Sequence, residues 1–282
     1  MSAAGAISWT PLPHVSVAGV RVATASRADL AEAMVRDCTA SRDGRGPAEP
    51  RLVFDSNGHG ISLAATDGGF RAALAQADVV HADGGFVVLA SRWAAAAPIA
   101  ERSATTDLLH DFARAAESAG LSFYLLGGTE AVNALCAERL RQLYPRLRIA
   151  GRQHGYFSAA DEAKVIDDIA LAAPDVLWVG LGKPREQVFA VAHRHRLRAG
   201  WIVTCGGCFN YVTGHYGRAP KWMQAMSLEW LYRAATDPRK LLWRYLTTSP
   251  HAIWLALRRA DRLTYAAANS ADSLRSEAPR AR

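Results

Sequence analysis

Between residues 107 and 204, short apolar runs alternate with segments whose apolar side chains recur every three or four residues. The short runs predict buried strands, and the periodic segments predict amphipathic helices. We expect helices at Asp107–Ser118, Glu130–Leu143, Ala159–Leu171 and Arg185–Arg196, and strands at Leu121–Leu126, Leu147–Ala150, Asp175–Val179 and Trp201–Thr204. Parallel sheets covered by helices on both faces show this alternation. The pattern therefore predicts an α/β fold with a doubly wound, mostly parallel sheet.

The N-terminal part shows the same pattern in shorter pieces. The expected elements are a β-hairpin over 14–24, a helix over 28–39 capped by Ser26, a strand over 51–54, helices over 61–66 and 70–76, and a strand that contains Val79 and Val80. The strand over 51–54 leads into the turn Asp55-Ser56-Asn57-Gly58, and the last strand ends at Asp83. Both turns would lie at the carboxyl edge of the sheet.

Beyond Gly214 only helical patterns remain. One helix is expected from Pro220 to Arg233, and a second begins at Asp237-Pro238 and runs on to Leu257. From Asn269 the composition turns to Ser, Ala, Arg and Glu, which is typical of disorder. We therefore expect an α/β domain over 1–214, a helical appendage over 215–268 and a disordered tail over 269–282.

Charge and aromatic content single out this C-terminal segment. The chain of 282 residues has 33 Lys and Arg against 26 Asp and Glu, a net charge of +7. Eight of these basic residues lie between Arg218 and Arg259, with only two acids, and six Trp or Tyr residues are interleaved with them. This mixture favours binding at an anionic membrane surface. Packing of the aromatic side chains onto the α/β core remains the alternative.

Several classes of site and segment are disfavoured. The N-terminus lacks the pattern of a signal peptide, and no apolar run reaches about 18 residues. Cys205-Gly-Gly-Cys208 has no partner pair at zinc spacing, so we interpret it as a buried strand end and a tight turn, which fits a reducing compartment. The spacing of His193 and His195 puts them on different helix faces, and Asp167-Asp168 lies in the middle of a predicted helix. We expect no metal site.

Asp83 is the candidate for chemistry, because ligands of open α/β sheets lie beyond the carboxyl ends of strands. A carboxylate there can accept a proton from a hydroxyl nucleophile. It can equally cap the helix that follows Gly84-Gly85. Glycine turns also follow three other strands, at Gly127-Gly128, Gly180-Leu-Gly182 and Gly206-Gly207, but none has the acidic residue of a dinucleotide fingerprint.

The motifs in order resemble those of the WecG/TagA/CpsF family of inverting bacterial glycosyltransferases, over roughly Leu52 to Tyr245. The motifs are Ala82-Asp83-Gly84, Glu101-Arg102 with Asp107-Leu108, Tyr144-Pro145, Gly155-Tyr156-Phe157, Pro174-Asp175, Gly180-Leu-Gly182-Lys-Pro184, Gly206-Gly207, Arg218-Ala-Pro220, Glu229-Trp230-Leu-Tyr-Arg233, Asp237-Pro238-Arg239 and Arg244-Tyr245. Each motif alone is weak, whereas the ordered set is specific.

The resemblance implies a role for particular residues. Asp83 matches the general base. The implied substrate contacts are Asn57, Arg102, Asp107, Gly182, Pro184, Arg185, Gly206 and Gly207, together with Glu186 or Gln187, between which the sequence does not decide. Arg233, Arg239 and Arg244 match basic residues of the appendage that would face the diphosphate and the membrane.

The resemblance also implies the reaction. A hexose or N-acetylhexosamine (N-acetylmannosamine, its uronic acid or glucose) would pass from a UDP-sugar to an undecaprenyl-diphosphate-linked saccharide during cell-surface polysaccharide synthesis. No cofactor, metal or nucleic acid would take part, and the protein would lie in the cytoplasm on the inner face of the membrane. Self-association is left open.

This chain departs from the family pattern near the predicted sugar site. Glu186-Gln187 reverses the usual Gln-Glu order, Asp55 replaces a usual Thr, and Thr105 replaces a usual Gly. A rival from another class is a non-catalytic basic module that binds anionic lipid or nucleic acid. A Rossmann-type oxidoreductase or methyltransferase is disfavoured because the glycine turns lack the downstream acid.

Overall fold

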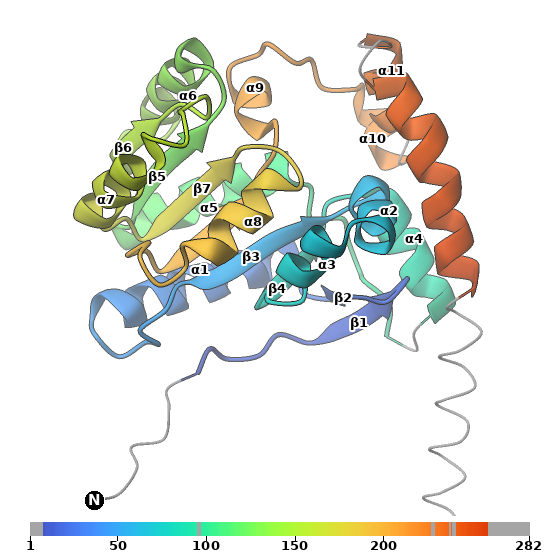
Figure 1. The fold of residues 1–282 in the computed structure, drawn as a ribbon, viewed down its shortest axis with the longest axis horizontal. Helices are drawn as coiled ribbons and strands as arrows, with labels where there is room; N and C mark the ends of the chain where they lie inside the picture. Colours follow the sequence, from blue (N-terminus) through green and yellow to red (C-terminus); the bar gives the residue numbers. More distant parts are fainter. Residues whose placement is uncertain (1–7, 95–96, 227–228, 237, 239–240, 259–282) are drawn as a thin grey trace, which may run out of the picture.

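A six-stranded parallel sheet forms the centre of the computed structural model, which describes residues 8–94, 97–226, 229–236, 238 and 241–258 (Figure 1). The strands are β3 (Arg51–Ser56), β4 (Val79–Ala82), β5 (Ser122–Gly127), β6 (Arg148–Gln153), β7 (Val176–Gly180) and β8 (Trp201–Thr204), in the order β4-β3-β8-β7-β5-β6. The chain runs from β3 to β4 at one edge of the sheet and then crosses to β5 and to β6 at the other edge. It returns through β7 to β8, which lies beside β3. The predicted doubly wound α/β fold is confirmed.

Helices cover both faces of the sheet. The helices are α1 (Arg27–Arg42), α2 (Gly58–Thr66), α3 (Gly68–Leu74), α4 (Gly85–Ala94), α5 (Thr105–Ala119), α6 (Glu130–Leu143), α7 (Glu162–Ala172), α8 (Arg185–Ala192) and α9 (Cys208–Val212). One hydrophobic cluster packs α1, α5 and α6 against one face, and another packs α7 and α8 against the other. Successive strand side chains alternate between the two clusters: Leu177 and Val179 belong to one, and Trp178 to the other.

The local signals mark most element boundaries correctly. Ser26 caps α1 through a capping box with Asp29. Helix α8 ends at Ala192, four residues before the predicted Arg196, and residues 193–196 form turns. The free, buried thiols of Cys205 and Cys208 agree with a strand end followed by a tight turn.

The predicted hairpin forms a separate two-stranded sheet, β1 (His14–Val17) with β2 (Val20–Ala23), beside β4. Its valines share a hydrophobic cluster with α4 and with Ala252, Leu255 and Ala256. These last three residues belong to a helix over 241–258. The last described helix therefore packs back onto the N-terminal hairpin.

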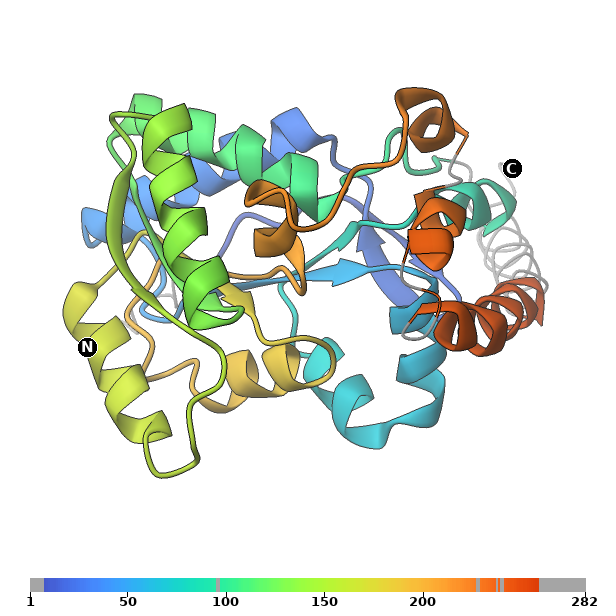
Figure 2. The same cartoon turned by 90° about the horizontal axis from the view of Figure 1, so that it is seen from above.

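The C-terminal segment is helical, as predicted, but divided differently. Helices α10 (Lys221–Ala225) and α11 (Glu229–Thr236) stand where one helix was expected, because α10 ends at Met226. With α4 and the helix over 241–258 they lie at one end of the molecule (Figures 1 and 2). None of the helices in the described ranges is long and apolar enough to cross a membrane. The predicted tail over 269–282 lies outside the described residues.

Close backbone contact shapes the carboxyl edge of the sheet at Gly127. Gly127 has φ of +137°, and a Cβ atom there would lie 2.3 Å from the carbonyl oxygen of Gly180 on β7. Only glycine accommodates both the φ angle and the contact. Gly120, the C-cap residue of α5, has φ of +63°, but no atom lies within 4 Å of the position that a Cβ atom would take there.

We therefore predict that Gly127→Ala destabilises the fold far more than Gly120→Ala. The first change adds a backbone clash to an unfavourable φ and should cost about 2–5 kcal/mol. The second adds only the unfavourable φ and should cost about 1–2 kcal/mol. Urea unfolding followed by circular dichroism measures both, and equal losses would contradict the role given to the Gly127–Gly180 contact.

Candidate active site

The carboxyl ends of four neighbouring strands gather most of the predicted site residues. Asn57 follows β3, Asp83 follows β4, the segment 182–187 follows β7, and Gly206-Gly207 follows β8. Because these strands are parallel, all four turns open at the same edge of the sheet. Residues far apart in the sequence therefore form one site.

The half-buried carboxylate of Asp83 is held by donors from two other elements. Its Oδ1 atom accepts from the backbone N–H of Thr105 at 2.8 Å and from the Thr105 hydroxyl at 3.1 Å. Its Oδ2 atom accepts from Asn57 Nδ2 at 3.2 Å. Asp83 thus binds a free N–H in the first turn of α5, so the capping alternative applies to α5 and not to the adjacent α4. A carboxylate offers about four acceptor positions, which leaves Oδ2 able to accept a further donor.

The surroundings of Asp83 keep it ionised. Burial alone would raise its pKa, but the hydrogen bond from the Thr105 backbone, the charge of Lys183 and the hydrogen bond from Asn57 lower the pKa to about 2. Asp83 is therefore a carboxylate throughout the physiological pH range.

Asn57 links Asp83 to the start of α2. Its side-chain oxygen caps α2 by accepting from the N–H of Gly60 at 3.0 Å, and its Nδ2 atom donates to both Asp83 and Asp55. A Cβ atom on Gly84 would lie 2.9 Å from the Cβ atom of Asn57. The glycine after Asp83 is therefore needed for this close approach.

A buried ion pair that the sequence did not reveal lies beneath Asn57. Lys183 Nζ contacts Asp55 Oδ2, and both side chains are less than a tenth exposed. Burial would lower the pKa of Lys183, but the carboxylates of Asp55 and Glu186 raise it above its ordinary value. Lys183 was visible only as the unassigned residue of the Gly-Lys-Pro loop, and no local spacing pairs it with a residue 128 positions earlier.

Glu186 and Gln187 are both fully buried. One oxygen of Glu186 accepts from the N–H groups of Gly182 and Gly206, each at 3.0 Å, so this carboxylate joins the loops after β7 and β8. Burial raises its pKa. Gln187 donates to Glu186 and to Thr204. Neither side chain has a surface open to solvent in this conformation.

The other predicted loop residues lie in the turns next to Glu186 and Gln187. Gly182 and Gly206 have φ of +80° and +51°, so each turn uses a conformation that favours glycine. Pro184 precedes the first residue of α8, and the Arg185 guanidinium donates to the Gly155 carbonyl and lies over the Phe157 ring. Gly207 begins α9.

Arg102 and Asp107 are paired with the C-terminal segment. Arg102 donates to Glu229 of α11 at 2.6 Å, and Arg218 donates to Asp107 at 2.8 Å. A salt bridge near Glu101 was the alternative for Arg102, but Glu101 instead accepts from the backbone of Arg27. These ion pairs hold the appendage against the site. Neither Glu229 nor Arg218 was predicted to be a site residue.

Two appendage arginines lie close to the site. Arg233 lies over the ring of Tyr211, 5.0 Å from its centre; burial would lower its pKa, but Tyr211, Tyr245 and Asp83 raise it. Arg244 has a buried Nε atom without a hydrogen-bond partner among the described residues. Arg239 lies outside the described residues.

His59, in the first turn of α2, faces the same region but was not singled out from the sequence. Its Nδ1 atom is buried without a partner among the described residues. Burial and the charges of Arg244 and Lys183 lower its pKa to about 4, so it is neutral near pH 7. The sequence feature that could have identified His59 is its position two residues after Asn57, in the first turn of a helix.

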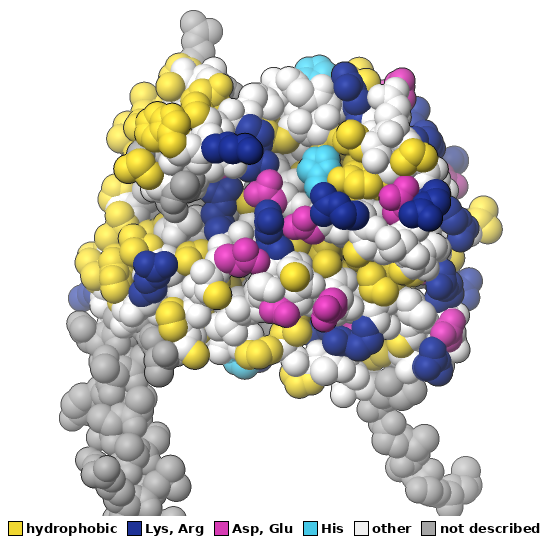
Figure 3. Space-filling view, turned by 180° about the vertical axis from the view of Figure 1, so that it is seen from behind, with side chains coloured by type: hydrophobic (Ala, Val, Ile, Leu, Met, Phe, Trp, Pro, Cys, Tyr) yellow, Lys and Arg dark blue, Asp and Glu magenta, His cyan; other side chains and the backbone are white. Residues whose placement is uncertain are grey.

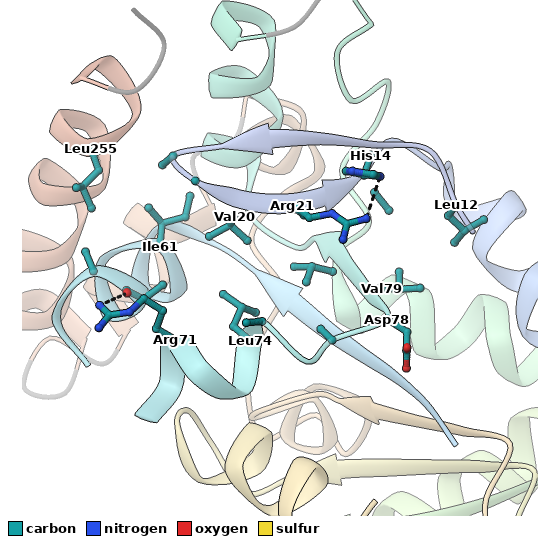
Figure 4. A pocket seen from close by; sticks show the side chains of 18 of the residues that line it. Leu12, His14, Val20, Arg21, Ile61, Arg71, Leu74, Asp78, Val79 and Leu255 are labelled. Atoms are coloured by element: carbon teal, nitrogen blue, oxygen red, sulfur yellow. Dashed lines mark hydrogen bonds between the residues drawn. The ribbon is translucent and has the colours of Figure 1, made fainter. Parts of the chain in front are cut away.

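A cavity of about 570 Å³ lies elsewhere, between the hairpin, α2, α3 and the start of β4 (Figure 4). Its lining includes the apolar side chains of Leu74, Val79 and Leu255 and the polar side chains of Arg21 and Asp78. The predicted site residues within the described ranges do not line this cavity. Within the part of the chain that the structure describes, no three His, Cys, Asp or Glu side chains are arranged to hold a metal ion.

Known proteins resemble this chain over most of its length. Residues 15–265 match the glycosyl transferase WecG/TagA/CpsF family. The chain is 31% identical over 189 residues to the N-acetylglucosaminyldiphosphoundecaprenol N-acetyl-beta-D-mannosaminyltransferase of Bacillus spizizenii, covering 67% of this chain and 72% of the relative. A protein of the same name from Staphylococcus aureus strain MRSA252 is 29% identical over 190 residues, covering 67% and 74%.

The matched span includes the carboxyl-edge site and the appendage helices that are paired with it. The chain therefore belongs to the WecG/TagA/CpsF family and is a glycosyltransferase.

Proposed function

We propose that the protein transfers an N-acetylhexosamine or hexose, with UDP-N-acetylmannosamine as the first donor to test, to an undecaprenyl-diphosphate-linked saccharide in cell-surface polysaccharide synthesis. The names of the relatives in Bacillus and Staphylococcus support this acceptor and this sugar. At about 30% identity the uronic acid and glucose remain further donors to test. The observation that carries the proposal is an ionised Asp83 at the carboxyl edge, with Arg233 near it and Arg244 near His59 at the start of α2.

In the proposed mechanism Asp83 accepts the proton of the acceptor hydroxyl. The hydroxyl oxygen attacks the anomeric carbon of the donor sugar from the face opposite the diphosphate, so the configuration inverts. Thr105 and Asn57 occupy three acceptor positions of the carboxylate and leave one on Oδ2 for the hydroxyl. With a pKa of about 2, Asp83 is a weak base, so the proton is transferred late, as the new C–O bond forms.

The departing diphosphate needs cationic donors. Two arginines of the appendage supply these donors: Arg233, and Arg244, whose Nε–H has no partner among the described residues. A guanidinium group can donate to two phosphate oxygens at once. We propose that no metal ion is required. Arg233 is held over Tyr211, which follows β8, so the appendage completes the site formed by the sheet.

The appendage also supplies a surface for an anionic membrane. Leu242, Leu246, Ile253 and Leu257 are exposed along one face of the helix over 241–258, next to the face that Ala252, Leu255 and Ala256 bury. Trp222, Trp230, Trp243 and Trp254 are exposed as well, which disfavours the alternative that these rings pack onto the core. Arg258 lies over the Trp254 ring. Rings and cations at one surface suit the lipid headgroup region of the cytoplasmic face.

Helix α4 extends this surface onto the α/β domain. Leu89 and Trp93, four residues apart on one face of α4, are each 47% exposed, and Arg92 lies beside them. Phe86 of α4 and Ala252 both lie within 4 Å of the position a Gly58 Cβ would take, so α4 and the C-terminal helix are neighbours. Figure 3 shows hydrophobic and basic side chains gathered at this edge of the molecule. We include Leu89 and Trp93 in the membrane-docking surface.

The first test of the proposal is the transfer assay. Wild-type protein with UDP-N-acetylmannosamine and a lipid-diphosphate-linked N-acetylglucosamine acceptor, in EDTA, should give a disaccharide product of inverted configuration. Asp83→Asn should lower kcat by about 10³-fold or more, because the proton acceptor is lost. Asp168→Asn, on the exposed side of α7, should leave kcat unchanged. An active Asp83→Asn variant would refute the base assignment, and absence of product with every UDP-sugar would favour the rival binding module.

The second test concerns the membrane-docking surface. Leu89→Ser/Trp93→Ser should weaken sedimentation with phosphatidylglycerol-containing vesicles by about tenfold, because buried apolar area is lost. Its activity on a short-chain, water-soluble acceptor should stay within about twofold of wild type.

The matched control is Leu143→Ser/Leu171→Ser. Both leucines are more exposed than Leu89 but lie on α6 and α7, at the opposite end of the molecule (Figure 1). Vesicle binding should not change in this control. Retained binding in the α4 variant, or equal loss in both variants, would show that α4 is not part of the docking surface.

A further inference from the structure

The buried ion pair of Lys183 and Asp55 has no part in the proposed reaction steps. Asp55 belongs to β3 and lies two residues before Asn57, whereas Lys183 belongs to the loop between β7 and α8. Thr204 also donates to Asp55, at 3.4 Å. The pair therefore connects three neighbouring strands directly beneath the carboxylate of Asp83.

Asp55, Asp83 and the Gly60 N–H together fix the orientation of the Asn57 amide. The Nδ2 atom of Asn57 has two N–H donors, and the structure uses one for Asp55 Oδ2 and one for Asp83 Oδ2, each at 3.2 Å. The amide oxygen accepts from the Gly60 N–H. A rotated amide would place its oxygen against two carboxylates and its NH₂ group against an N–H donor. Only one orientation of the Asn57 amide therefore satisfies all of these groups.

Lys183 is the cationic partner of the buried Asp55. Asp55 is 5% exposed and accepts from Lys183, Asn57 and Thr204. Loss of the lysine would leave this buried carboxylate without its opposite charge and would disturb its contact with Asn57. The Lys183 side chain is fixed in turn, because Gly60 leaves it room at the start of α2 and Glu186 holds the Gly182 and Gly206 turns on either side of it.

We propose that Lys183 and Asp55 are positioning residues, which act through the Asn57 amide to orient the Asp83 carboxylate toward the acceptor hydroxyl. The proposal rests on the proposed function in one respect, the role of Asp83 as base. The geometric part, a chain of contacts from Lys183 through Asp55 and Asn57 to Asp83, is independent of the sugar that is transferred.

The test compares Lys183→Met, Asp55→Asn and the double variant Asp55→Asn/Lys183→Met in the full-length protein. Each single variant leaves one buried charge unpaired, so both should melt at a lower temperature than wild type. The double variant removes both charges and should recover most of the melting temperature. In all three, kcat should fall about tenfold or more while KM stays within about threefold, because the orientation of Asp83 changes and not substrate binding.

A second readout does not need activity. The ¹³Cγ resonance of Asp83, assigned by its absence in Asp83→Asn, should titrate about 1 pH unit higher in Lys183→Met than in wild type, because a nearby positive charge has been removed. Lys164→Met removes an exposed lysine of α7 and should change neither this titration nor kcat.

The outcomes separate the possibilities. Recovery of both stability and kcat in the double variant would show that the pair is only structural, and would overturn the proposal. An unchanged Asp83 titration and unchanged kcat in Lys183→Met would overturn it as well. If wild-type protein transfers no sugar, the proposed function fails, and the Asp83 titration still decides whether Lys183 acts on this carboxylate.

Discussion

The buried carboxylate of Glu186 is the interaction on which the carboxyl edge of the sheet depends. It accepts from the backbone of Gly182 after β7 and of Gly206 after β8, and so holds two turns that have few side chains to pack. A buried charge is tolerated only where donors or an opposite charge compensate for it. Here two N–H groups and the neighbouring Lys183 do so, and Lys183 in turn makes a buried Asp55 tolerable. The site is therefore a network of buried polar contacts, in which removal of one member would leave another without its partner.

The fold was predictable from the sequence because its determinants are local. Strand runs, helical periodicity and caps such as Ser26 and Asn57 follow from neighbouring residues. The position of Asp83 at a strand end was equally local. The partners of these residues were not: Lys183 meets Asp55, Glu229 meets Arg102, and Arg218 meets Asp107 across more than 100 positions. Such contacts arise from the strand order of the sheet and from the path of the appendage, which hydrophobic periodicity does not specify.

The departures from the family pattern gain a physical meaning in the structure. Asp55 and Thr105 both touch the Asn57–Asp83 pair: Asp55 accepts from Asn57, and the Thr105 hydroxyl donates to Asp83. A glycine at 105 would keep the backbone donor but lack the hydroxyl, and a threonine at 55 would bring no charge for Lys183. The reversed Glu186-Gln187 order lies in the same network, since Gln187 donates to Glu186. These substitutions therefore alter how Asp83, the proposed base, is held, and they leave its carboxylate in place.

The low pKa of Asp83 imposes a compromise between orientation and basicity. Every hydrogen bond that fixes the carboxylate also stabilises its charge, and so weakens it as a proton acceptor. A stronger base would need fewer donors and would be less well oriented. Inverting transfer tolerates a weak base, because the acceptor hydroxyl becomes acidic only as its oxygen bonds to the anomeric carbon, late in the reaction. Cations near the diphosphate assist this order of events, since they favour departure of the leaving group before the proton moves. Arg233 and Arg244, which α11 and the helix over 241–258 bring beside the sheet edge, are placed for that role, so orientation by the sheet and charge from the appendage complement each other.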